Sequence, residues 1–196
     1  MLIRDTPLSA VWRACLLASV MLFTGIAARA QQRHSDGLDD VAQYVPYATV
    51  LALKACGVQS RDGWPRLALS TAASWVVAGG IGYTMKHSIH EWRPDHSDRR
   101  SFPSGHSLFA FAGATALHKE FGGVSPWVSV AGYGVATAVA VDRVLRDRHH
   151  WYDTVAGAGI GIAATHLTWW LGDKVLRSDH VALAFTGTQA CIAIRW

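Results

Sequence analysis

The stretch Leu67–Met85, LALSTAASWVVAGGIGYTM, carries no charged side chain and is rich in alanine, glycine and valine. A helix on the surface of a soluble protein would show a polar face at a period of 3.6 residues, and this stretch has none. Its length is close to the about 20 residues that cross a bilayer. The stretch therefore predicts a helix in an apolar environment, and a membrane is the environment that its length favours.

Four more segments are uncharged or nearly so, and we expect helices at Val41–Gly57, Ser107–Leu117, Phe121–Val141 and Thr154–Gly172. Hydrophobic residues make up 51% of the chain and charged residues 16%, which is apolar-rich against soluble domains. The sequence predicts an all-α fold, a transmembrane bundle of five to six helices. Ser107–Leu117 is short and also suits a buried helix of a soluble bundle, so a span for every segment is not required.

The two ends of the chain differ from this pattern. Residues 1–30 resemble a secretory signal peptide, with Arg4 and Arg13 before an uncharged run and Ala28-Arg29-Ala30 as a cleavage site. An uncleaved first transmembrane helix is the alternative, and both place residue 31 outside the cytoplasm. Residues 31–180 read as one domain. The tail, 181–196, alternates around a Thr-Gly-Thr turn and predicts a β-hairpin.

Threading the helices from an outside residue 31 places three clusters of polar residues on the outer face. They lie at 86–94, 103–106 and 143–153, and they gather many of the arginines. This excess of cations outside opposes the positive-inside rule, and we attribute it to an anionic ligand. The sequence contains no basic stripe with interleaved aromatic residues, so it gives no indication of nucleic-acid binding. Cys56 and Cys191 could pair in an oxidising compartment, whereas the threading places both toward the cytoplasm, where they would stay reduced.

The first cluster holds two cations. Lys86 and Arg93 are two helical turns apart, so both can point the same way at the end of a helix that Pro94 helps to stop. Such cations can hold the oxygens of a phosphate.

The second cluster, Pro103-Ser104-Gly105-His106, is typical of a helix start. Ser104 suits an N-cap, and Gly105 lets the backbone approach a ligand. The amides at the start of a helix favour an anion. His106 then lies where an acid for a leaving oxygen is needed.

The third cluster combines Arg143, His149 and Asp153. The i, i+4 spacing puts His149 and Asp153 on one face of a helix that starts at or before His149. The carboxylate can accept the Nδ1 proton and leave Nε2 to attack, while Arg143 offers a fork of donors to phosphate oxygens. His150 is the rival nucleophile, and its i, i+3 relation to Asp153 suits the role less well.

The pattern K-x6-RP, PSGH and R-x5-H-x3-D over Lys86–Asp153 resembles the type 2 phosphatidic acid phosphatase and vanadium haloperoxidase superfamily. The resemblance implies that 31–180 is a domain of this kind, and that the phosphatase branch needs no metal or other cofactor. The family usually has serine where this chain has Asp142, which puts one hydroxyl contact in doubt, provided the carboxylate turns away. The implied phosphate-binding residues are Lys86, Arg93, Ser104, Gly105 and Arg143, and the implied catalytic ones are His149 as phosphohistidine, Asp153 as its orienter and His106 as acid and base.

We therefore expect a phosphatase that cleaves a phosphomonoester or diphosphate from a lipid. Its partners would be the phosphorylated lipid and the membrane, with the site at the periplasmic face of a bacterial inner membrane. The first alternative is a soluble periplasmic acid phosphatase of broad specificity. A vanadate-dependent haloperoxidase and a non-catalytic lipid-binding membrane protein are the others.

Overall fold

The computed structural model describes residues 37–176, 181–185 and 190–194. The chain divides into two compact units, Met1–Leu38 and Asp39–Trp196, and the fold below is that of the second. The signal peptide predicted for 1–30 lies outside the described residues and stays a prediction.

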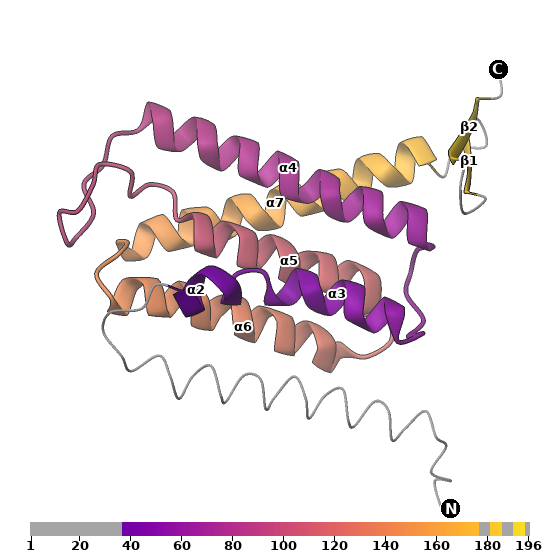
Figure 1. The fold of residues 1–196 in the computed structure, drawn as a ribbon, viewed down its shortest axis with the longest axis horizontal. Coiled ribbons are helices and arrows are strands. Elements are labelled where there is room, and N and C mark those ends of the chain that lie inside the picture. Colours follow the sequence, from indigo (N-terminus) through magenta and orange to yellow (C-terminus); the bar gives the residue numbers. More distant parts are fainter. Residues whose placement is uncertain (1–36, 177–180, 186–189, 195–196) are drawn as a thin grey trace, which may run out of the picture. The chain divides into compact units, whose positions relative to one another are not determined.

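The second unit is a bundle of helices built around α5. Among the described residues, six helices follow one another in the chain, and the helical fold class is confirmed. Helix α5 packs against α3, α4, α6 and α7 and takes the middle of the bundle (Figure 1). The helices are α2 (Gly37–Ala42), α3 (Val45–Ala55), α4 (Trp64–Ser88), α5 (Gly105–Phe121), α6 (Pro126–Leu145) and α7 (Trp151–Leu176).

Two predicted segments have wrong boundaries, because each contains a proline that begins a helix. Val41–Gly57 is divided into α2 and α3, and Pro46 occupies the first turn of α3. Phe121 closes α5 instead of opening the next helix, which begins at Pro126 and runs to Leu145. Proline suits the first helical turn because that turn has no intrahelical partner for its amides.

Helices α5 and α7 run side by side in the same direction with their backbones in close approach. A Cβ atom on Gly157 would collide with the carbonyl oxygen of Ser104, and one on Gly161 with that of Leu108. At the start of both helices, Ser104 N donates to Asp153 O at 3.0 Å. Small residues at such spacing let helices pack this tightly. The packing places the residues around Ser104 beside those that begin α7.

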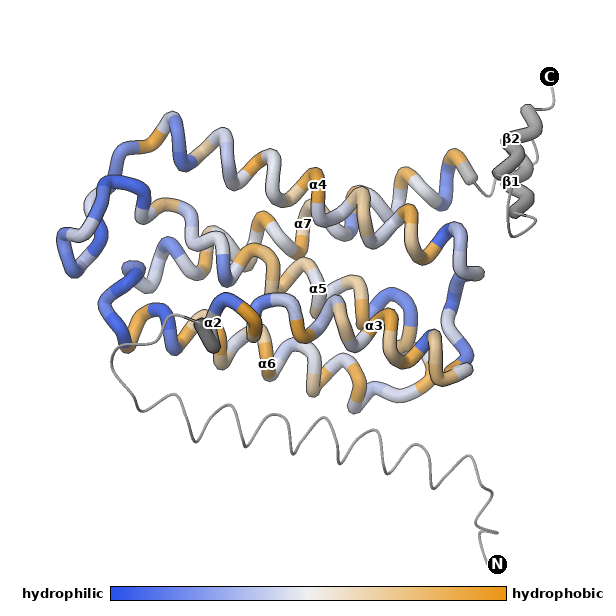
Figure 2. Tube along the Cα trace, in the orientation of Figure 1, coloured by the Kyte–Doolittle hydropathy of each residue, from blue (hydrophilic) through white to orange (hydrophobic). Residues whose placement is uncertain are grey.

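The interior of the bundle combines many alanines with a few large side chains such as Trp169 and Phe121, while other large apolar side chains lie on its outside. Trp127 is 68% exposed and Leu145 77% exposed, both on α6. Figure 2 shows hydrophobic positions along the helices and hydrophilic ones gathered toward the connections. Within the described residues, one helix, Pro126–Leu145, is long and apolar enough to cross a membrane. The fully buried small residues include Ala78, Ala110, Ala112, Ala114, Ala116 and Ala136.

Two short strands follow α7. Strand β1 (Val181–Phe185) pairs antiparallel with β2 (Ala190–Ile194), with Val181 opposite Ile194. The residues between the strands, 186–189, lie outside the described part of the chain, so the predicted hairpin turn stays a prediction. Cys56 is an exposed free thiol, and the side chain of Cys191 is not among those described.

Candidate active site

Lys86 lies in the last turn of α4, just beyond the predicted span, and reaches the start of α5. Its Nζ donates to the carbonyl of Arg100 at 2.9 Å, and its Cε is 3.8 Å from where a Cβ on Gly105 would stand. Burial and the positive charge of Arg93 lower the pKa of Lys86 to about 8, against the opposing charges of Asp98 and Asp153. The two cations Lys86 and Arg93 thus lie close enough to act on one anion.

Arg93 reaches the same place from a loop. Helix α4 ends at Ser88, so the prediction that Pro94 stops the helix carrying both cations is wrong. The Nε of Arg93 donates to Asp98 at 3.0 Å, and its Nη1 donates to the carbonyl of Arg148 at 3.1 Å. The second bond ties the loop between α4 and α5 to the loop before α7, and this tertiary contact positions the guanidinium.

Ser104 is the N-cap of α5, as predicted. Its Oγ accepts from the amide of Ser107 at 3.5 Å, and the residue is completely buried. Gly105 is the first residue of the helix. The peptide bond between Phe102 and Pro103 is cis.

His106 lies one residue further on and has a partner that the sequence gave no reason to expect. Its Nε2 is 2.9 Å from Oδ1 of Asp40 on α2. Burial lowers the pKa of His106, the charge of Arg143 lowers it further, and the bond to Asp40 opposes both. The imidazolium of His106 is therefore more acidic than a free one, and its contact with Asp40 still stabilises its charge.

His149 and Asp153 come together, although not on one helix face. Helix α7 begins at Trp151, so His149 precedes it, and the predicted shared face is wrong. His149 Nδ1 is 3.6 Å from Asp153 Oδ2, with side chains 2% and 0% exposed. Asp153 is the third residue of α7, and its Oδ2 accepts from the amide of His150 at 2.9 Å. A carboxylate at this position caps the helix start, which explains where the side chain points.

Ser101 completes the link between His149 and Asp153, and the sequence analysis missed it. Its Oγ donates to Asp153 Oδ2 at 2.5 Å and lies 3.4 Å from His149 Nδ1. The hydroxyl can thus accept a hydrogen bond from the Nδ1–H of His149 while it donates one to the carboxylate of Asp153. A serine in a loop has no periodic pattern that would signal this role.

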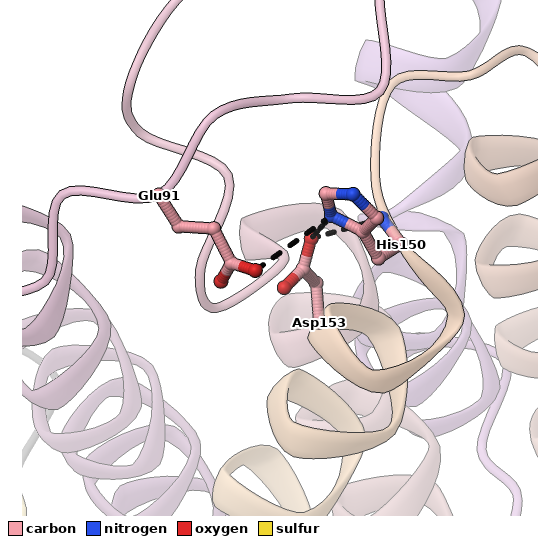
Figure 3. Close-up of side chains that lie close together, drawn as sticks. All are labelled: Glu91, His150 and Asp153. Atoms are coloured by element: carbon pink, nitrogen blue, oxygen red, sulfur yellow. Dashed lines mark hydrogen bonds and ion pairs between the residues drawn. The ribbon is translucent and has the colours of Figure 1, made fainter.

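His150 lies beside this group, together with Glu91 of the α4–α5 loop. Its Nδ1 is 3.3 Å from Asp153 Oδ2 and 3.9 Å from Glu91 Oε1 (Figure 3). One donor atom from each of these three side chains lies within 4.8 Å of the others, so they could hold a metal ion. The ring of His150 stacks on Tyr152 at 4.9 Å, and the Tyr152 hydroxyl donates to Glu91.

The charges around His149 are predominantly positive. Burial lowers the pKa of His149 far below its ordinary value, and the largest charge effects after burial come from Arg93, Lys86, Arg143 and His106. Arg143 projects from the last turn of α6 and is 3% exposed. The structure therefore brings the predicted cations together around the buried imidazole of His149.

The family model of the PAP2 superfamily matches residues 66–177, which include all three clusters and more than half of the chain. The chain belongs to the PAP2 superfamily. The resemblance found in the motifs is thus confirmed. A lipid A 1-phosphatase from Porphyromonas gingivalis is 38% identical over 141 residues, which are 71% of this chain and 32% of that protein. The chain spans about a third of the length of this relative.

One solved structure shows the same fold, and a second has a lower similarity. The crystal structure of LpxE from Aquifex aeolicus is 20% identical with a TM-score of 0.54, and the match covers 87% of this chain and 99% of that one. A transmembrane PAP2 type phosphatidylglycerolphosphate phosphatase from Bacillus subtilis is also 20% identical, with a TM-score of 0.42 over 81% of this chain and 98% of the other.

Asp142, the departure from the usual PAP2 pattern, has a cation of its own beside it. Its carboxylate pairs with Arg146 one turn further along α6, at 3.1 Å. That arginine neutralises the charge, so the PAP2 site keeps its positive character beside Arg143.

Proposed function

We propose that the protein is a metal-independent phosphatase that hydrolyses a lipid phosphomonoester or diphosphate through a phosphohistidine at His149. The observation that carries the proposal is the buried, uncharged imidazole of His149 among the positive charges of Arg93, Lys86 and Arg143. A phosphoryl group in transfer carries its charge on three equatorial oxygens, and fixed cations stabilise that charge.

In the first step, the lone pair on His149 Nε2 attacks phosphorus in line with the leaving oxygen. The P–N bond forms, the bond from phosphorus to the leaving oxygen breaks, and His106 gives its proton to that oxygen. Asp153, with the hydroxyl of Ser101 between, stabilises the Nδ1–H of His149 as positive charge develops on the ring. A pKa of His106 lowered by burial and Arg143 makes this proton transfer easier.

In the second step, a water attacks the phosphohistidine. His106, now neutral, takes a proton from the water, the P–O bond forms and the P–N bond breaks. His149 regains its lone pair, and inorganic phosphate leaves from the cations that held it. Each proton that His106 gives in the first step is thus recovered in the second.

The outer surface of the bundle supports a lipid substrate and a membrane location. Large apolar side chains such as Trp127 and Leu145 lie on the outside of the bundle, as expected where acyl chains surround it. We propose that the protein lies in a bacterial inner membrane with the site toward the periplasm. In this proposal, residues 1–30 form a leader, residues 31–180 the catalytic domain and residues 181–196 a hairpin tail.

Aromatic side chains next to His106 suit the tail of a lipid leaving group. Phe109 lies one helical turn after His106 on α5, and its ring stacks on Trp75 at 5.3 Å and lies 6.0 Å from Tyr44. Trp75 and Tyr44 are 45% and 41% exposed. A tail attached to the oxygen that His106 protonates would lie against this cluster.

A soluble periplasmic acid phosphatase is the second candidate, and one observation favours it. Among the described residues only α6 is long and apolar enough to cross a membrane, where the sequence predicted several spans. Carbonate extraction of bacterial membranes separates the two: the membrane enzyme stays in the pellet, and the soluble one is released.

Phosphate release by detergent-purified protein with EDTA present tests the proposal. The panel contains undecaprenyl diphosphate, phosphatidic acid, phosphatidylglycerol phosphate, lipid A and p-nitrophenyl phosphate, with His149→Ala alongside and His90→Ala as a control at an exposed histidine. We expect release from at least one lipid that His149→Ala abolishes and His90→Ala retains. Release mainly from the small ester favours the soluble candidate, and release that persists in His149→Ala contradicts the mechanism.

A further inference from the structure

Three side chains beside the proposed nucleophile have the donors and the spacing of a metal site. Glu91, His150 and Asp153 turn toward one another from the α4–α5 loop and the start of α7 (Figure 3). His150 Nδ1 lies 3.3 Å from Asp153 Oδ2 and 3.9 Å from Glu91 Oε1. Ligand atoms on a tetrahedral zinc ion lie about 3.3 Å apart, given bonds of about 2.0–2.1 Å. The first separation matches this value, and the second exceeds it by about 0.6 Å, a distance that a rotation of the partly exposed Glu91 side chain can close.

Other contacts hold each donor in place. The Tyr152 hydroxyl donates to Glu91, and the Tyr152 ring stacks on His150 at an interplanar angle of 7°. Ser101 donates to Asp153 Oδ2. Such outer contacts orient metal ligands and raise affinity. The site needs little rearrangement to receive an ion.

A second observation indicates a missing ligand. Asp153 is completely buried, and its Oδ1 has no hydrogen-bond partner within the described part of the chain. A buried carboxylate oxygen without a partner is costly, and a cation bound through both oxygens of Asp153 would satisfy it. Glu91 and His150 are 28% and 32% exposed, which leaves a path for an ion from solvent.

We propose that Glu91, His150 and Asp153 bind Zn²⁺, and that the bound ion inhibits the enzyme. One imidazole nitrogen with two carboxylate oxygens suits zinc, whereas magnesium and calcium prefer oxygen alone. The inhibitory part rests on the proposed function, and the binding part does not. An ion on Asp153 neutralises the carboxylate that stabilises the charged ring of His149, so the first step slows.

Metal binding is measured directly on full-length, detergent-purified protein without an affinity tag. Co²⁺ serves as the probe, because a site of low coordination number gives visible absorption bands, and Zn²⁺ then displaces it. We expect one site in the wild type, and at least about tenfold weaker binding in Glu91→Gln and in His150→Gln. His90→Gln, at the exposed histidine next to Glu91, should bind like the wild type. No Co²⁺ or Zn²⁺ binding, or equal binding by Glu91→Gln, would overturn the site.

Inhibition is measured as phosphate release against Zn²⁺ concentration. Glu91→Gln should keep the basal rate and need at least about tenfold more Zn²⁺ for half inhibition, and EDTA should restore the wild-type rate. Equal inhibition of both proteins would overturn the inhibitory role. If the protein releases phosphate from no substrate, the proposed function fails, while the Co²⁺ result still decides the metal site.

Discussion

The two ends of the bundle both bury charged side chains, and they use them in opposite ways. At the end formed by the start of α4 and the ends of α5 and α7, Arg66 pairs with Asp173 and lies 3.4 Å from Asp62. There Glu120 accepts from Trp169 Nε1 at 3.0 Å and from the amide of Asp62 at 3.1 Å. In this far-end network, the charged and polar side chains form ion pairs and hydrogen bonds with one another.

At the other end, the strongest charges that act on His149 are all positive. Lys86, Arg93 and Arg143 surround an imidazole whose own pKa is lowered by burial and by them. A network that is complete in itself stabilises the fold, whereas an excess of one sign around a neutral group is stabilised only when an anion binds. The contrast suggests different roles for the two groups: we expect the far-end network to stabilise the fold and the cations around His149 to act in the reaction.

Replacing one arginine at each end should give opposite results, and this is the largest effect we expect. Arg143→Gln should lower kcat/KM by about 1,000-fold, because a fixed charge on the transferring phosphoryl group is lost. Arg66→Gln should leave kcat of the folded protein near wild type and cost about 1–3 kcal/mol of stability, because Asp173 and Asp62 each lose one ion pair, while Asp173 keeps Arg61. Steady-state kinetics and thermal unfolding in detergent measure both.

The stability of Arg143→Gln is the informative control. Removing a positive charge relieves repulsion within this cluster, which should offset part of the cost of losing the contacts of a buried arginine, so Arg143→Gln should lose less stability than Arg66→Gln. A large loss of stability in Arg143→Gln, with activity per folded molecule retained, would show that the two ends are alike.

Ser101→Ala should reduce kcat by about 10- to 100-fold with little change in KM. The hydroxyl links Asp153 to His149 without belonging to the cations that hold phosphate. Ser88→Ala is the matched control, since Ser88 is an exposed serine at the end of α4 whose hydroxyl bonds only to Thr84 O in the described contacts. An equal effect on KM and kcat, or none on either, would rule out a positioning role.

The pH profile should reveal Lys86 as a second basic limb. The acid role of His106 makes kcat/KM fall as pH rises through its pKa, which burial lowers. Lys86, with a pKa lowered to about 8 by burial, holds phosphate only while protonated, so the fall should steepen above about pH 8. The added loss is about tenfold between pH 7 and 9. Lys86→Arg stays charged and should remove the steepening, and a profile unchanged by this substitution would contradict the role.

Asp142→Ser should have the smallest effect, a change in kcat/KM of less than about threefold. The carboxylate already pairs with Arg146, and an i, i+4 pair of this kind contributes about 0.3–0.5 kcal/mol. Restoring the serine that the family usually has therefore relieves little repulsion. A gain of tenfold or more would mean that Asp142 faces the phosphate.

The helices were predictable from sequence because each depends on a local pattern. Leu67–Met85 became the middle of α4, and Ser104 became the N-cap of α5. The errors at Val41–Gly57 and Phe121–Val141 came from apolar content that continues across a break, where Pro46 and Pro126 were the overlooked signals.

The contacts between elements were not predictable in this way. Arg93 is positioned by the carbonyl of Arg148, and His106 by Asp40, across large separations in sequence. Spacing suggested that His149 and Asp153 share a helix, yet the link depends on Ser101 in a loop. Motif resemblance supplied the site residues, and the geometry that connects them needed the folded chain.

The central claim is that His149, and not its neighbour His150, carries the phosphoryl group. The test is direct: the protein reacts briefly with ³²P-labelled lipid substrate, the reaction is quenched, and the labelled peptide is identified after protease digestion at alkaline pH. Alkaline conditions are required because phosphohistidine is stable to base and labile to acid. We expect label on His149, lost in His149→Ala and retained in His150→Gln. Label on His150, or turnover with no acid-labile phosphoenzyme in any variant, would contradict the account.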